Sequence, residues 1–140
     1  MRRNLIRCLL AAALLPVLTP VLAGDDFVII VNKDNGDAVD RDLVAKIYRG
    51  EVKTWPGGGS VVSVALPDDS PVRAAFDKTV LGKSPAQSKA LWAQLTFTGK
   101  ALPPKMADSE SDVIKIVTES KNAVGYVSAH AVPASVKTIK

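Results

Sequence analysis

Four runs of apolar residues along the chain have the composition of β-strands. The run at 27–31 (FVIIV) is continuous and rich in β-branched residues, which is typical of a strand buried on both faces of a sheet. The run at 61–66 (VVSVAL) indicates a second buried strand. The segments at 123–128 and 136–139 also contain β-branched apolar residues. The pattern therefore predicts a sheet built from these strands.

Segments with apolar residues at helical spacing lie between the predicted strands. They cover 41–49, 71–81, 85–95 and 110–119. A residue that favours the helix N-cap precedes each one: Asp40, Ser70, Ser84 and Ser109. Because parallel strands need crossover connections, this alternation predicts an α/β fold with a mixed, mostly parallel sheet flanked by helices.

The first 23 residues have the three parts of a secretory signal peptide. A basic start is followed by an apolar run over 8–22 and by the small residues Val21 and Ala23. Pro16 and Pro20 interrupt the run, which is also shorter than the ~20 residues of a membrane-spanning helix. We therefore expect a signal peptide at 1–23 and one exported domain at 24–140, located in the periplasm.

The excess of basic residues belongs to this leader. The full chain has 18 Lys and Arg against 14 Asp and Glu, and without Arg2, Arg3 and Arg7 the balance is 15 against 14. No block of Lys or Arg remains, and aromatic residues are few. Nucleic acid is therefore not expected as a partner.

The segment after the leader offers few groups for catalysis or metal binding. Cys8 lies in the leader, and His130 is the single histidine, so thiolate chemistry and a histidine metal centre are not expected. The sequence has no Gly-x-Ser-x-Gly elbow, and no Lys-Ser/Thr pair follows the glycines at 57–59. We expect a protein that is not an enzyme and that needs no cofactor.

The stretch PDDSPVRAAF (67–76) places a cation near the start of a predicted helix. Ser70 is the expected cap, and Arg73 occupies the third helical position. The N-terminus of a helix carries a partial positive charge, which disfavours a basic residue there. Either Arg73 binds an anion that is not part of the chain, or it pairs with a nearby aspartate: Asp68, Asp69 or Asp77.

Five segments occur in an order that is familiar from one group of transport proteins. They are IIVNKDN (29–35), DLVAKIYRGEVKTWPGG (42–58), PDDSPVRAAF (67–76), VLGKSP…LWAQLTFTGK (80–100) and NAVGYVSA (122–129). Together they resemble the periplasmic phosphate-binding proteins of ABC transporters, and in particular short, one-lobe members of the type II periplasmic binding protein superfamily. The resemblance covers nearly all of the chain after the leader and implies a single lobe of that fold.

The resemblance also implies a set of ligand-binding residues. The family's anion motif, Arg-x-Asp-Gly-Ser-Gly-Thr, falls on 66–72, where Asp68 and Ser70 match and Val72 stands at the threonine position. Arg73 can replace the missing guanidinium, since Leu66 stands at the motif's arginine. The expected ligand-binding residues are completed by Asn32, which follows the first strand at the edge where α/β sheets bind ligands.

Departures from the motif predict weak binding. Asp69 and Pro71 replace two glycines, adding a negative charge and removing an N–H donor. The expected partners are phosphate or a related oxyanion and a membrane transporter or sensor protein. Because one lobe has no second wall to close over a ligand, a homodimer is also expected. The alternative is a periplasmic protein-interaction module that has lost ligand binding.

The leader generates a prediction about processing. We expect protein recovered from the native cell envelope to begin at Gly24, because small residues at positions 21 and 23 precede it. Mass spectrometry of the N-terminal peptide checks this. Recovery of an intact Met1 terminus in the membrane fraction would contradict it.

Overall fold

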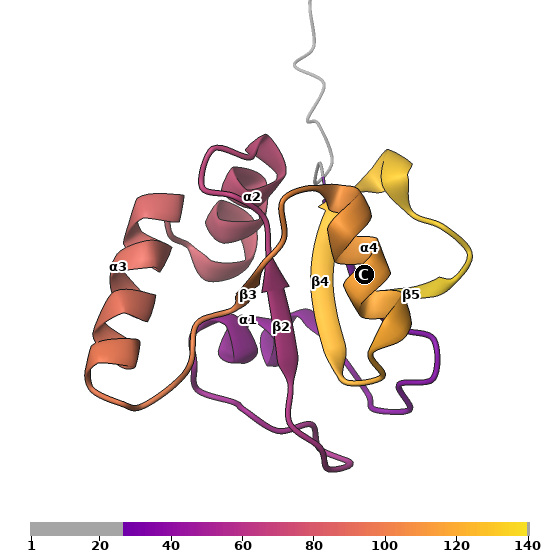
Figure 1. Cartoon of the computed structure of the whole chain (residues 1–140), viewed down its shortest axis with the longest axis horizontal. Coiled ribbons are helices and arrows are strands. Elements are labelled where there is room, and N and C mark those ends of the chain that lie inside the picture. The colour runs from indigo at the N-terminus through magenta and orange to yellow at the C-terminus, as the bar shows by residue number, and fades with distance from the viewer. Residues whose placement is uncertain (1–26, 140) are drawn as a thin grey trace, which may run out of the picture.

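A five-stranded mixed sheet forms the centre of the computed structural model, which describes residues 27–139 (Figure 1). The strands lie in the order β3-β2-β4-β1-β5. Their bounds are β1 Phe27–Asn32, β2 Val62–Ala65, β3 Lys105–Met106, β4 Ala123–Ser128 and β5 Val136–Ile139. The predicted signal peptide at 1–23 lies outside the described residues.

Four of the five strands run in the same direction. β2 pairs in parallel with β3 and with β4, whereas β1 pairs antiparallel with both β4 and β5. β1 is therefore the one described strand that runs against the others. The expected mixed, mostly parallel sheet is confirmed, and the reversal of β1 places its C-terminal end opposite that of β2.

The helices begin where the sequence predicts them. Their bounds are α1 Arg41–Tyr48, α2 Pro71–Phe76, α3 Pro85–Phe97 and α4 Glu110–Glu119. Each expected N-cap side chain accepts a backbone hydrogen bond, and Ser84 forms a reciprocal capping box with Gln87. After Phe76 the helix widens into a π-helical turn, Asp77–Leu81, which ends at Gly82 in the left-handed conformation with φ 64°.

Two elements lack a sequence signal. β3 is a two-residue strand of exposed residues, and the 3₁₀ turn Ala129–Ala131 buries none of its side chains. Both form because the neighbouring structure positions them. β3, for example, extends the sheet where Val64 and Ala65 of β2 offer free backbone groups.

Helices cover both faces of the sheet. On one face, Tyr126 of β4 stacks on Phe76 of α2, with ring centroids 3.9 Å apart, and also contacts Tyr48 of α1. On the other face α4 covers β4 (Figure 1). Gly125 of β4 points to this face, because successive strand residues point to opposite sides, and it lies against Val113 and Val117 of α4. The core is thus divided by the sheet into an aromatic layer and a layer of valines.

Two buried tyrosines tie the aromatic layer to the strands. The Tyr48 hydroxyl donates to the Val64 carbonyl at 2.6 Å and lies 3.2 Å from the Val124 carbonyl. The Tyr126 hydroxyl accepts a hydrogen bond from the Leu66 N–H at 3.2 Å. Burial raises the pKa of both hydroxyls above the ordinary value, so they stay neutral and remain able to donate.

Gly125 generates a prediction about packing. A Cβ atom added there would lie 2.6 Å from the Cγ1 atom of Val113, so Gly125→Ala should lower the free energy of unfolding by ~1–3 kcal/mol. The loss should shrink in a Val113→Ala background, where the clashing methyl group is absent. Urea unfolding measures both effects. Gly36→Ala is the matched control, since its added Cβ would meet nothing within 4 Å, and an equal loss at both glycines would contradict the packing argument.

Candidate functional site

A cleft of about 860 Å³ opens between α3 and the β2–β3 edge of the sheet. It begins at the C-terminal end of β2, where residues 67–69 and the first turns of α2 form its polar end. The other walls are apolar side chains: Trp92, Phe97, Pro103, Pro104 and Met106. The arrangement joins a small group of charges to a large apolar surface, which is common in ligand sites.

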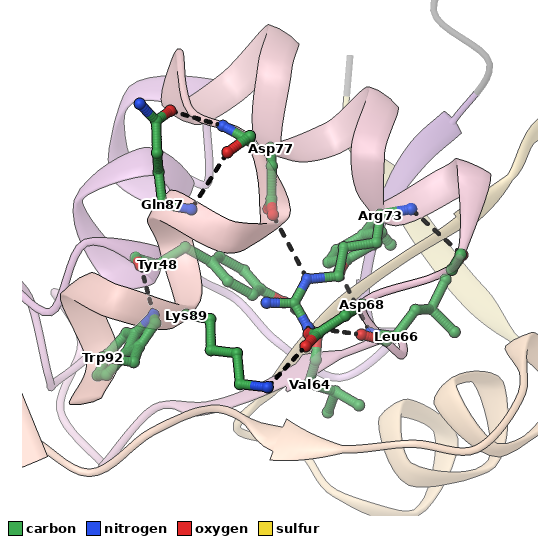
Figure 2. Close-up of polar contacts among 12 residues, drawn as sticks. Tyr48, Val64, Leu66, Asp68, Arg73, Asp77, Gln87, Lys89 and Trp92 are labelled. Carbon is green, nitrogen blue, oxygen red and sulfur yellow. Dashed lines mark hydrogen bonds and ion pairs between the residues drawn. The ribbon is translucent and has the colours of Figure 1, made fainter.

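Arg73 is the central charge of the polar end. Its side chain is 7% exposed, and Figure 2 shows its guanidinium between two aspartates. Nε lies 3.4 Å from Asp77 Oδ2, and Nη1 lies 2.6 Å from Asp68 Oδ1. Nη1 also donates to the Leu66 carbonyl at 3.0 Å. The sequence leaves two roles open for Arg73: pairing with an aspartate or binding an external anion. In the structure Arg73 pairs with two aspartates.

Asp77 forms the buried half of this pair. Its side chain is 4% exposed, and burial raises the pKa of its carboxyl, while the nearby Arg73 charge acts in the opposite direction. The Ser88 hydroxyl lies close enough to favour the charged form of Asp77, although its geometry falls short of a hydrogen bond. Arg73 is therefore the main group that compensates the buried carboxylate.

Asp68 is the accessible half of the group. Its carboxylate bridges two cations, since Oδ1 contacts Arg73 and Oδ2 lies 3.2 Å from Lys89 Nζ on α3 (Figure 2). The side chains of Asp68 and Lys89 are 45% and 73% exposed, so both can move without opening the core. With Asp69 also lining the cleft, three acidic residues face two basic ones.

The structure brings together some of the predicted site residues. Asp68 and Arg73 meet in the cleft. Ser70 caps α2 and accepts a hydrogen bond from the Arg73 N–H at 3.3 Å, so it fixes the position of Arg73 on the helix. Val72 is half-buried against the core.

Asn32 lies elsewhere. Its amide donates to the carbonyls of Val117 and Thr118 at 2.8 and 3.0 Å, and its oxygen accepts from the Asp34 N–H. Because β1 runs against β2, the C-terminal ends of the two strands lie at opposite ends of the sheet. The structure therefore does not bring Asn32 together with Asp68 and Arg73, and its ligand role stays a prediction.

Sequence reasoning missed the apolar part of the cleft. Of the three large apolar residues in the middle of α3, Leu91, Trp92 and Leu95, only Trp92 is buried, and the two leucines are half-buried. Phe97 lines the cleft although it is 93% exposed. No local signal in the sequence marks this part of the cleft, because α3 buries only Ser88 and Trp92 and the exposure of its other side chains depends on the elements beside it.

Residues 27–139 contain neither a cluster of metal ligands nor a helix suited to a bilayer. Within that range, no group of three or more His, Cys, Asp or Glu side chains is arranged to hold a metal ion. No helix of the described part has the length and hydropathy needed to cross a bilayer.

The buried pair generates a prediction about stability and pH. Arg73→Ala leaves the Asp77 carboxylate buried without its cation and should destabilise the fold by ~3 kcal/mol. The loss should be smaller near pH 4 than near pH 7, since removing Arg73 raises the pKa of Asp77 further and the protonated form is cheaper to bury. Urea unfolding at both pH values measures this.

A double variant provides the control for this prediction. Arg73→Ala combined with Asp77→Ala removes both charges, so its destabilisation should be smaller than the sum of the two single losses. Strictly additive losses, together with no dependence on pH, would show that the pair is not coupled as the geometry implies.

The sequence profile of one family, described as the PBP superfamily domain, matches residues 16–139. No curated protein matches the sequence significantly. Among solved structures, the chain is similar to a putative phosphate ABC transporter substrate-binding protein from Clostridium perfringens with bound phosphate. The identity is 26% and the TM-score 0.66, over 83% of this chain and 44% of that one.

A second solved structure agrees on the fold. It is an ABC-type phosphate transport receptor from Vibrio cholerae, with 23% identity and a TM-score of 0.62, over 83% of this chain and 46% of that one. The chain thus spans less than half the length of the proteins that it matches. The match to the family profile covers most of the sequence, and the five-stranded sheet with its covering helices agrees with it. The chain therefore belongs to the family described as the PBP superfamily domain.

Proposed function

We propose that the chain is a ligand-binding lobe that acts in the periplasm and binds an oxyanion of the phosphate class at the polar end of its cleft. The role is binding rather than catalysis, and it serves an ABC-type uptake system or a sensor in the membrane. Support comes from the family and from the similar protein of Clostridium perfringens, whose structure holds phosphate.

The observation that carries the proposal is the position of the Asp68 carboxylate. It contacts Arg73 with one oxygen and Lys89 with the other, which is how a bound oxyanion would be held by two cations. Asp68 thus stands in for the ligand. Because Asp68 is an exposed loop residue, its carboxylate can turn toward solvent, and an external anion can then take its place.

The same arrangement explains why binding should be weak. A carboxylate tethered to the site is present at a high effective concentration and competes with any free anion. Asp69 adds a further negative charge to the cleft lining. Ser70 contributes by capping α2 and holding Arg73 in position, whereas Pro71 offers no N–H donor at the first helical position.

A second function is favoured by a different observation. Phe97 is 93% exposed and Met106 is 54% exposed, and both line the cleft. Large exposed apolar residues beside a groove are typical of surfaces that contact another protein. The alternative proposal is therefore a periplasmic interaction module whose cleft receives a transporter or sensor protein and whose Arg73 serves only the fold.

Anion titration distinguishes the two functions. We expect phosphate to bind the wild-type domain weakly at low ionic strength and Asp68→Asn to bind it about tenfold more tightly, a gain of ~1.4 kcal/mol, because the variant removes the competing charge. Isothermal titration calorimetry measures both, and low salt avoids screening of a weak site.

The matched control is Asp42→Asn. Asp42 also forms an exposed ion pair, with Lys46 on α1, but it does not line the cleft, so this variant should bind phosphate as the wild type does. If neither the wild type nor Asp68→Asn gives heat with phosphate or sulfate, oxyanion binding is excluded and the interaction module is the better description.

A further inference from the structure

The cleft is elongated along α3. Lys89, Trp92, Ala93, Thr96 and Phe97 all line it, and their spacing of three or four residues places them on one side of the helix. Lys89 marks the polar end and Phe97 the apolar end. At 1.5 Å per residue, these two residues lie about 12 Å apart along the helix axis.

The protein does not fill this space with its own side chains. α3 buries only Ser88 and Trp92, and the Trp92 indole donates to the Tyr48 carbonyl at 3.1 Å. Beyond Trp92, the helix carries Thr96 and Phe97 toward the cleft, and both are exposed. Pro103 and Pro104, from the segment that leads into β3, and Met106 of β3 also line the cleft. The result is an apolar channel that continues from the Asp68 ion pair.

An inorganic anion would use only one end of such a site. The cleft volume of about 860 Å³ lies within the range of sites for organic ligands, ~300–1,000 Å³. A small oxyanion between Arg73 and Lys89 would leave the apolar walls in contact with water. Covering those walls with an apolar group is favourable in proportion to the area removed from water.

We propose that the cleft binds a soluble amphiphilic oxyanion, namely a phosphate or phosphonate group that carries an apolar tail. The tail is about 10 Å long, which fits within the ~12 Å that separate Lys89 from Phe97 along the helix axis. The head group takes the place of the Asp68 carboxylate between Arg73 and Lys89. The tail lies along α3 against Trp92, Phe97 and Met106. This inference rests on the proposed oxyanion function and adds the chemical class of the ligand.

The charges favour this ligand over the alternatives. Arg73 and Lys89 converge on the Asp68 carboxylate, which can move. An anionic head group can therefore replace that carboxylate without a change in the sign of the charge. Asp77 stays paired with Arg73 throughout and keeps the guanidinium in place. A neutral apolar molecule would gain only the tail contacts, and inorganic phosphate would gain only the head contacts.

A series of straight-chain alkyl phosphates tests the inference. Titration calorimetry with phosphate and with ethyl, butyl, hexyl and octyl phosphate, all as monomers at low salt, gives affinity as a function of tail length. We expect about a fourfold gain per buried methylene, the factor equivalent to ~0.8 kcal/mol. Asp68→Asn should raise the affinity of every member by the same factor, because it acts on the head group alone.

Two exposed residues supply the variant and its matched control. Phe97→Ser should flatten the dependence on tail length and leave the affinity for inorganic phosphate unchanged, without loss of stability, since Phe97 is 93% exposed. Leu102 is 85% exposed and does not line the cleft, so Leu102→Ser should behave as the wild type does.

The outcomes separate failure of this inference from failure of the proposed function. Equal affinities for phosphate and octyl phosphate would overturn the inference and leave oxyanion binding intact. If no member of the series binds either the wild type or Asp68→Asn, both fail. Octanol that binds as tightly as octyl phosphate would overturn both, since the charged end would then contribute nothing.

Two further measurements exclude other occupants of the cleft. Phosphatidylcholine vesicles that contain phosphatidic acid carry the same head group in a bilayer, and we expect no cosedimentation with them. Vesicle binding that Phe97→Ser abolishes would assign the cleft to a membrane surface and overturn the soluble ligand. Sedimentation analysis that finds a dimer, dissociated by Phe97→Ser, would assign it to a second copy of the chain.

Discussion

The Arg73 guanidinium is the contact on which the site and much of the fold depend. It joins the end of β2, through the Leu66 carbonyl, to the π-helical turn, through Asp77, and to the exposed loop, through Asp68. A buried carboxylate such as Asp77 is tolerated only with a cation beside it. The residue that supplies the buried positive charge at the polar end of the cleft is thus also a structural requirement, which limits how far this end of the cleft can change without loss of the fold.

The direction of β1 determines which residues can share a site. Continuous apolar runs indicate buried strands but carry no information on their direction, because parallel and antiparallel neighbours bury the same side chains. Asn32 could share an edge with the end of β2 only if β1 ran with β2, and the antiparallel pairing of β1 with β4 places it at the other end of the sheet. There it holds the last turn of α4 through two carbonyls.

Local signals explain what the sequence could predict, and their absence explains the rest. The caps at Asp40, Ser70, Ser84 and Ser109 act within three residues, so the helix starts are readable from the chain alone. The choice of Asp68 and Asp77 over Asp69 depends on how the π-helical turn and the loop fold around Arg73. The apolar cleft depends on where α3 stands relative to β3, and a two-residue strand of Lys and Met gives no pattern to predict.

The attachment of α3 explains how the cleft acquires its second side within the described residues. α3 is tied to the sheet through Trp92 and Tyr48, whose hydroxyl in turn reaches β2 and β4. At its N-terminal side Lys89 reaches Asp68, and beyond Trp92 the helix carries exposed residues. Trp92 and Leu95 lie against Gly50, whereas Thr96 and Phe97 stay exposed, so α3 supplies a second wall of the cleft from within the same lobe. The wall that α3 provides is therefore positioned by the Trp92 hydrogen bond and the Lys89–Asp68 ion pair rather than by burial of a whole helix face.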